Sequence, residues 1–267
     1  AHTTAALIGV SHTLLSKSGG YLRNDVLPPW SLLDNMPSWE RGVVIELRDS
    51  VRALRNDFSR EQTQSAEDRD LAQADAQFHF DDSHWMLPAT EEEFAAGTEA
   101  LRRYLHRLHT SGSEQARFFV RADNLNFYLA TVGKRLGAYA QQLSGNVLGP
   151  SAGTRGAEQG AGAEFTRTPW KDVDNVFYEA RGYAWALLHT LRGIERDFGN
   201  VIEAKAADGA LEQIIRKLEE TQATVRSPLI LNTSGFGLLT NHSLVMASYM
   251  SRANAALIEL RQLIAEG

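Results

Sequence analysis

The chain of 267 residues has 27 basic and 33 acidic side chains, and its net charge of −6 argues against nucleic acid as the main partner, because phosphate binding needs a strongly basic face. It has no cysteine, which excludes disulfides, thiolate catalysis and cysteine-ligated zinc or iron–sulfur centres. A hydrophobic fraction of 43% and a charged fraction of 22% are typical of a globular protein that folds around a sizeable core.

The first element that the sequence predicts is an N-terminal helix within residues 1–20. Residues 4–18 carry Leu7, Val10 and Leu14 at helical spacing, and two glycines follow this stretch. No stretch of the chain approaches the roughly 20 apolar residues that are needed to cross a membrane. Because the chain begins with alanine and not with methionine, we expect that an anchor or signal segment has been removed upstream.

A second helix, predicted over residues 37–59, has the clearest apolar stripe in the chain. Its apolar side chains recur every three or four residues and are Trp39, Val43, Leu47, Val51, Leu54 and Phe58. Such a stripe indicates one buried helix face.

The following region is predicted to contain two more long helices. Residues 59–77 are polar and are expected to contain a short helix, and residues 78–88 read as irregular. A capping box that starts at Thr90 predicts one long helix. The other is expected to follow residues 111–113 and to run to about Ser144.

A linker rich in glycine and alanine, residues 146–165, separates this region from a second helical region. There the apolar spacing predicts a long helix over 168–205, a short one around 211–218 and a last one over 241–265. Residues 224–240 read as a loop. Strand signals are nearly absent, so we predict an all-α protein.

One segment of the chain occurs twice. Shifting the sequence by 140 residues aligns residues 29–58 with 169–198 without a gap and gives 10 identical positions, where roughly two are expected by chance. A repeat of this length indicates a duplicated structural unit, with the copies packed around a pseudo-two-fold axis. We therefore predict a helical bundle of two related units, residues 21–145 and 166–267, in addition to the N-terminal helix.

The repeat retains two arginines in each copy, Arg41 and Arg52 in the first and Arg181 and Arg192 in the second. Within one copy they are about three helical turns apart and point nearly the same way. Four guanidiniums around the pseudo-axis could bind a small anion, a lipid headgroup or a cell-wall fragment. The interpretation that we favour is that each arginine pairs with a carboxylate or a helix C-terminus and fixes how the copies dock.

A possible metal site is suggested by two histidines and two aspartates between residues 79 and 84. In an extended segment His79 and Asp81 face one way and Asp82 and His84 the other, so all four converge only around a turn. We treat His79 and Asp81 as weak candidate ligands, predict no cofactor or metal, and lean against an enzyme.

Two polar motifs remain. Residues 232–237 lead through His242 and Ser243 into a helix, where free amides could hold an anion. Their spacing fits neither a phosphate-binding loop nor a nucleophile elbow, so a capped loop is the favoured interpretation. Asn124 and Asn126 lie inside a helix and are expected to form hydrogen bonds to a neighbouring helix.

Several long strings resemble a known family across nearly the whole chain. They are Gly19-Gly-Tyr-Leu-Arg-Asn-Asp25, Leu33-Asp-Asn-Met-Pro-Ser-Trp-Glu40, Phe78-His-Phe-Asp81, Ala122-Asp-Asn-Leu-Asn126, Val176-Phe-Tyr-Glu-Ala-Arg-Gly182 and Asn241-His-Ser-Leu-Val-Met-Ala247. On these strings the chain resembles the bacterial family called domain of unknown function 2333. The resemblance implies a transmembrane helix upstream of this chain and a location on the periplasmic side of the inner membrane in Gram-negative bacteria. It supplies no activity, ligand or catalytic residue.

These inferences favour a non-enzymatic interaction or scaffold module for envelope or membrane proteins. One alternative is a binding domain for a small anion, a lipid headgroup or a cell-wall fragment that uses the repeated arginines. A less favoured alternative is a metal-dependent hydrolase centred on His79 and Asp81. The sequence does not predict an oligomeric state.

Overall fold

The computed structural model describes residues 1–25, 35–61, 66–85, 88–110, 116–145, 173–224 and 242–266, and within these ranges the long regular elements are all helices. They are α1 (His2–Ser16), α2 (Asn35–Ala53) with the π-helical turn η2 (Leu54–Phe58), α3 (Arg69–Phe78), α4 (Thr90–Leu108), α5 (Ala122–Gly145), α6 (Val173–Ala204), α7 (Asp208–Thr221) and α8 (His242–Glu266). The all-α prediction is confirmed. Within the same ranges, no helix is both long enough and apolar enough for a bilayer crossing.

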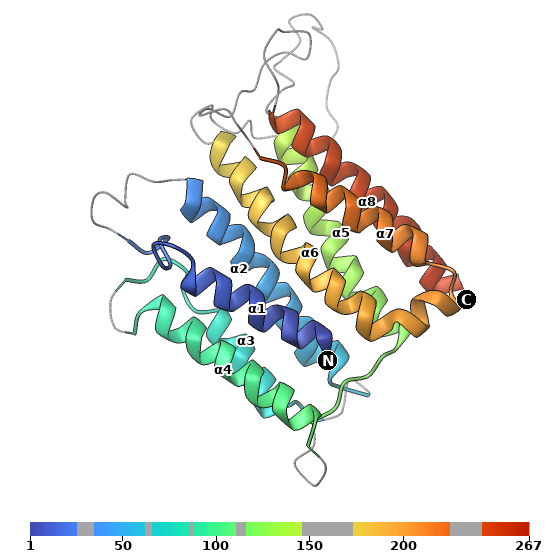
Figure 1. Cartoon of the computed structure of the whole chain (residues 1–267), viewed down its shortest axis with the longest axis horizontal. Helices are drawn as coiled ribbons and strands as arrows, with labels where there is room; N and C mark the ends of the chain where they lie inside the picture. The colour runs from blue at the N-terminus through green and yellow to red at the C-terminus, as the bar shows by residue number, and fades with distance from the viewer. Residues whose placement is uncertain are drawn as a thin grey trace, which may run out of the picture.

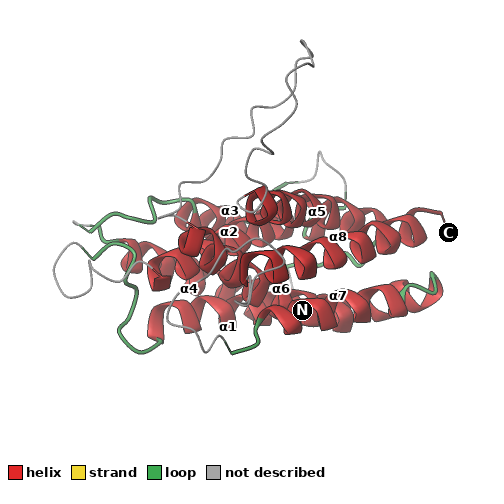
Figure 2. Ribbon diagram, turned by 90° about the horizontal axis from the view of Figure 1, so that it is seen from above, coloured by secondary structure: helices red, strands yellow, loops and turns green. Residues whose placement is uncertain are grey.

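The helices form two stacked layers (Figures 1 and 2). One layer contains α3, α2, α5 and α8 in that order, and the other contains α4, α1, α6 and α7. In the centre α2 packs along α6, while the pairs α3–α4 and α7–α8 close the two edges. The first four helices therefore lie on one side of the molecule and the last four on the other, with the α2–α6 contact between them (Figure 1).

Both predicted apolar stripes are buried where α2 meets α6. In the first stripe only Trp39 keeps partial exposure. In the second stripe the buried side chains are Tyr183, Leu187, Leu191, Ile194 and Phe198. Phe58 and Phe198, which the offset of 140 residues aligns, lie with their ring centroids 5.3 Å apart. Burial of each such side chain contributes about 1.5–3 kcal/mol, so this interface is a large part of the core.

Two glycines allow the backbones of α2 and α6 to touch. A Cβ atom on Gly42 would lie 2.0 Å from the carbonyl oxygen of Glu179, and one on Gly182 would lie 2.0 Å from that of Trp39. A close-packed interior has no room for such an atom, so any other residue would push the helices apart. The Arg-Gly pair that both copies retain is therefore explained by its glycine.

Helix α1 is fixed at both ends. At its start the Asp197 carboxylate of α6 accepts hydrogen bonds from the amides of His2 and Thr3, at 2.8 Å each, and so acts as an N-cap from another helix. At its end the Lys17 ammonium pairs with Glu40, whose carboxylate is fully buried. Glu40 also accepts main-chain hydrogen bonds from the turn that follows α1, which ties α1 to α2.

The capping box predicted at Thr90 does not form. Thr90 is itself the first residue of α4, and its hydroxyl donates to the carbonyl oxygens of Asp81 and His84, at 2.8 Å each. The hydroxyl is used to close the irregular segment before the helix, so it does not cap the helix amides.

Helix α5 begins later than predicted. Residues 116–121 form no helix, and the Phe119 amide donates to the carbonyl oxygen of Phe58, at 2.6 Å. This places Phe118 against Phe58 and Phe198, with centroids 5.6 and 5.8 Å away. Tertiary aromatic packing therefore overrides the helical periodicity of this stretch. The predicted linker, 146–165, lies outside the described residues.

Candidate functional site

Two of the repeated arginines form ion pairs with different helices. The Nε atom of Arg41 lies 3.5 Å from a carboxylate oxygen of Glu179, which links α2 to α6. An Nη atom of Arg192 lies 2.5 Å from a carboxylate oxygen of Glu219, which links α6 to α7. All four side chains are substantially exposed except Glu179, so water screens both pairs.

Arg181 contacts the end of α7. Its two Nη atoms donate to the carbonyl oxygens of Gln222 and Ala223, at 2.9 Å each. These carbonyls follow the last turn of α7, where acceptors are left without helical partners. Burial lowers the pKa of the Arg181 guanidinium.

Arg52 and His79 contact each other. An Nη atom of Arg52 donates to Nε2 of His79, at 2.5 Å, and Nδ1 of His79 lies 2.7 Å from the Asp75 carbonyl oxygen. Because a guanidinium can only donate, Nε2 accepts and Nδ1 carries the proton. The Asp81 carboxylate accepts from the amide and the hydroxyl of Ser83, at 2.9 and 2.8 Å. In the described ranges, no three histidine, aspartate or glutamate side chains gather in a way that could hold a metal ion.

The remaining polar motifs have local roles or lie outside the described residues. Asn126 accepts from Nε of Arg261, at 2.9 Å, so α5 is hydrogen-bonded to α8 as expected. Asn124 donates only to the nearby Phe119 carbonyl oxygen, at 3.4 Å. Residues 232–237 are not among those that the structure describes.

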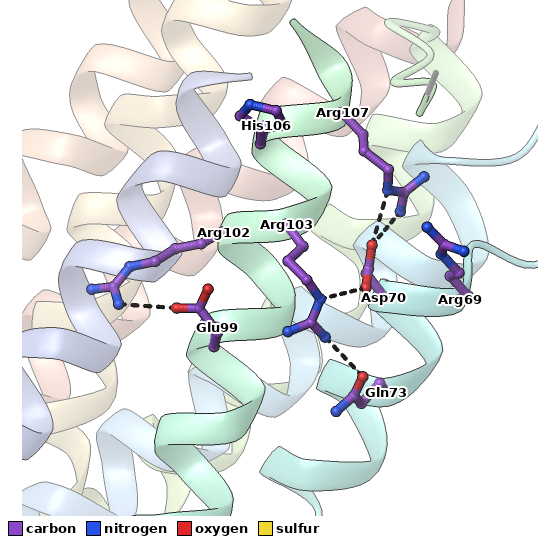
Figure 3. A pocket seen from close by; sticks show the side chains of 8 residues that line it. All are labelled: Arg69, Asp70, Gln73, Glu99, Arg102, Arg103, His106 and Arg107. Atoms are coloured by element: carbon purple, nitrogen blue, oxygen red, sulfur yellow. Dashed lines mark hydrogen bonds and ion pairs between the residues drawn. The ribbon is translucent and has the colours of Figure 1, made fainter. Parts of the chain in front are cut away.

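A different set of arginines gathers on the outer face of α3 and α4. A hollow of about 940 Å³ lies between these two helices, which we call the arginine groove (Figure 3). Its lining residues are Arg69, Asp70, Gln73, Glu99, Arg102, Arg103, His106 and Arg107. Those of α4 recur every three or four residues, so helical geometry places them on one face.

Asp70 organises the inner side of the arginine groove. Its carboxylate, 7% exposed, accepts from Nε of Arg103 at 2.9 Å and from Nε and Nη2 of Arg107 at 2.9 and 2.6 Å. Burial would raise the pKa of Asp70, but these hydrogen bonds outweigh burial and hold the pKa below its ordinary value. Arg107 also donates to Asp68, at 2.6 Å, and Asp68 caps the start of α3. The carboxylates thus fix the direction of two guanidiniums.

The outer side of the arginine groove is more open. The Arg102 side chain is 50% exposed and lies 3.4 Å from Glu99. Arg103 is 42% exposed and donates to Gln73 at 2.8 Å. Four arginines and two acidic residues line the groove, which leaves a surplus of two positive charges, before any protonation of His106. Since a guanidinium has five N–H donors, this arrangement can bind an anionic group from solvent.

Reasoning from the sequence missed this groove. The signal was available in part, because Arg102, Arg103, His106 and Arg107 share one helix face. The partner helix was not predictable, since the groove needs α3 to lie antiparallel to α4, and the sequence gave only a short, uncertain helix there.

A buried carboxylate lies between α2 and α5. Glu46 is 1% exposed, and one of its oxygens accepts from the hydroxyls of Ser50 and Tyr128, at 2.5 and 3.1 Å. Its other oxygen has no hydrogen-bond partner in the described part of the chain. Burial raises the pKa of Glu46 to about 7, against the effect of its hydrogen bonds.

Comparison with known proteins identifies the family but no function. The model of a family described as "Uncharacterized protein conserved in bacteria (DUF2333)" matches residues 1–267. No curated protein and no solved structure matches the chain.

Proposed function

Because the chain belongs to this family of uncharacterised bacterial proteins, we propose a function from its geometry: a non-enzymatic interaction module whose arginine groove binds an acidic segment of an envelope protein. The observation that carries the proposal is the hollow of about 940 Å³ with its surplus of positive charge. An open groove along two helices suits an extended chain with several carboxylates, and guanidiniums bind carboxylates in a bidentate manner.

The non-enzymatic character is supported by how the candidate catalytic groups are used. Both nitrogens of His79 and the carboxylate of Asp81 have protein partners. Asp70 is held by two arginines and keeps a low pKa, which does not suit a proton acceptor near neutral pH.

We also propose that the molecule consists of two duplicated units around a pseudo-two-fold axis between α2 and α6. Support comes from reciprocal contacts: Gly42 faces Glu179 and Gly182 faces Trp39, and the offset of 140 residues exchanges the two pairs. The neighbours of α1 are α2, α4 and α6, and those of α5 are α6, α8 and α2. This packing favours units α1–α4 and α5–α8 over a boundary at residue 145. A crystal structure in which the two sets of four helices do not superpose would contradict this part.

The proposed location is the periplasmic side of the inner membrane, with an anchor upstream of the chain. Support for it is the resemblance of the sequence strings to the family. Protease treatment of cells with a permeabilised outer membrane tests it on the full-length protein. Digestion of this region is expected, and protection until the inner membrane is broken would contradict the location.

The groove proposal is tested with fluorescently labelled hexaglutamate as the probe, measured by anisotropy. We expect saturable binding that weakens steeply between about 50 and 200 mM salt, because several ion pairs form. Arg102→Glu reverses one exposed charge and is expected to weaken binding about tenfold or more.

The matched control is Arg216→Glu. Arg216 on α7 forms an exposed helical ion pair with Glu212 at 3.6 Å, much as Arg102 does with Glu99. The control should bind as the unaltered protein does. Equal weakening by both variants would mean that only net charge matters, and it would contradict the proposal. Binding to phosphatidylglycerol vesicles without binding to hexaglutamate would favour the lipid-headgroup alternative.

A further inference from the structure

A second hollow, of about 250 Å³, lies where α6, α7 and α8 meet. Its walls are largely apolar and include Phe177 of α6 and Val245, Met246 and Tyr249 of α8. Arg181 of α6 also lines it. One guanidinium is therefore placed beside a small apolar space.

The charge of Arg181 is not compensated by a carboxylate in the described part of the chain. Its printed partners are the main-chain carbonyl oxygens of Gln222 and Ala223. The acidic residue in the same wall, Glu220, pairs with Lys217 at 2.7 Å. A half-buried cation whose hydrogen bonds reach only neutral oxygens retains a strong attraction for an anion.

The repeat explains how this charge came to lack an acidic partner. The offset of 140 residues aligns Arg181 with Arg41, and it aligns Glu179, the ion-pair partner of Arg41, with Trp39. The position that carries a carboxylate next to Arg41 therefore carries an indole in the equivalent place next to Arg181. The two arginines are alike in sequence but have different surroundings.

We propose that this pocket binds a small amphiphilic carboxylic acid, with the carboxylate on Arg181 and the apolar tail against Phe177 and Val245. The volume of about 250 Å³ equals that of roughly eight liquid water molecules, which fits a tail of medium length and excludes a folded partner. The first turn of α8, to which Val245 belongs, adds a partial positive charge. This site is separate from the arginine groove and does not depend on it.

The test uses sodium octanoate as the probe and follows its NMR relaxation as the unaltered protein is added. Saturable binding with a dissociation constant on the order of 1 mM is expected for a ligand of this size. Octanol, which has the same tail without the charge, should bind about tenfold more weakly or less. No saturable octanoate binding, or equal binding of octanol, would overturn the proposal.

Two variants of α8 locate the site. Val245→Asp places a negative charge in the pocket wall, at a side chain that is 44% exposed, and should weaken octanoate binding about tenfold or more. Ile258→Asp makes the same kind of change on the same helix, at a side chain that is 49% exposed and outside the pocket, and should leave binding within about twofold. Equal effects of the two variants would also overturn the proposal.

Discussion

The repeated arginines and the arginines of the groove are used in different ways. Arg41, Arg181 and Arg192 each tie one helix to another through a separate partner. In the arginine groove, by contrast, four arginines share one hollow, and Asp70 holds two of them in place. The first set spreads over the molecule, and the second concentrates charge on one face.

The difference teaches that retention in both copies marks packing in this chain. Gly42 and Gly182 are retained because the α2 and α6 backbones touch there. Arg102 aligns with no retained arginine, since residue 242 is a histidine, and the groove belongs to one side of the molecule only. Features that could bind a partner are therefore found where the two halves differ.

The largest expected effect breaks the packing side of this comparison. Gly42→Ala places a methyl group in the backbone of α6 and should lower the free energy of unfolding by about 3 kcal/mol or more, measured by chemical denaturation. Gly199→Ala is the control in α6, because a Cβ atom there meets nothing within 4 Å. It should stabilise by about 0.5–1 kcal/mol. A small effect of Gly42→Ala would refute the close approach.

A pH-dependent effect at Glu46 sharpens the same side. The folded-state pKa of about 7 lies above the ordinary 4.5, so the folded protein holds a proton that the unfolded chain releases as pH rises between these values. Stability should therefore fall from pH 5 to pH 8, by up to about 3 kcal/mol from this group. Glu46→Gln should remove that part of the fall. Parallel pH profiles of the two proteins would show that Glu46 does not titrate there.

The smallest effects divide the repeated arginines themselves. Arg192→Gln removes an exposed ion pair and should change the free energy of unfolding by no more than about 0.5 kcal/mol. Arg181→Gln removes two hydrogen bonds to the end of α7 and should cost about 1–2 kcal/mol. Thermal and chemical denaturation of both variants would check this, and a larger loss for Arg192→Gln would reverse the assignment.

The sequence was sufficient for the helices and their buried faces. The stripes from Val43 to Phe58 and from Tyr183 to Phe198 are buried as predicted, because periodicity reports directly which face meets the core. It was not sufficient where tertiary contacts decide the local structure. Phe118 was placed in a helix but lies before α5, and Thr90 bonds to a distant loop. The groove was missed because it depends on which helices are neighbours.

The most direct test of the central claim is a titration of the protein with hexaglutamate, followed by NMR of the arginine Nε–H groups. The account predicts saturable shifts for Arg102 and Arg103 and none for Arg41 or Arg192. Shifts confined to the repeated arginines, or no shifts at all, would contradict it.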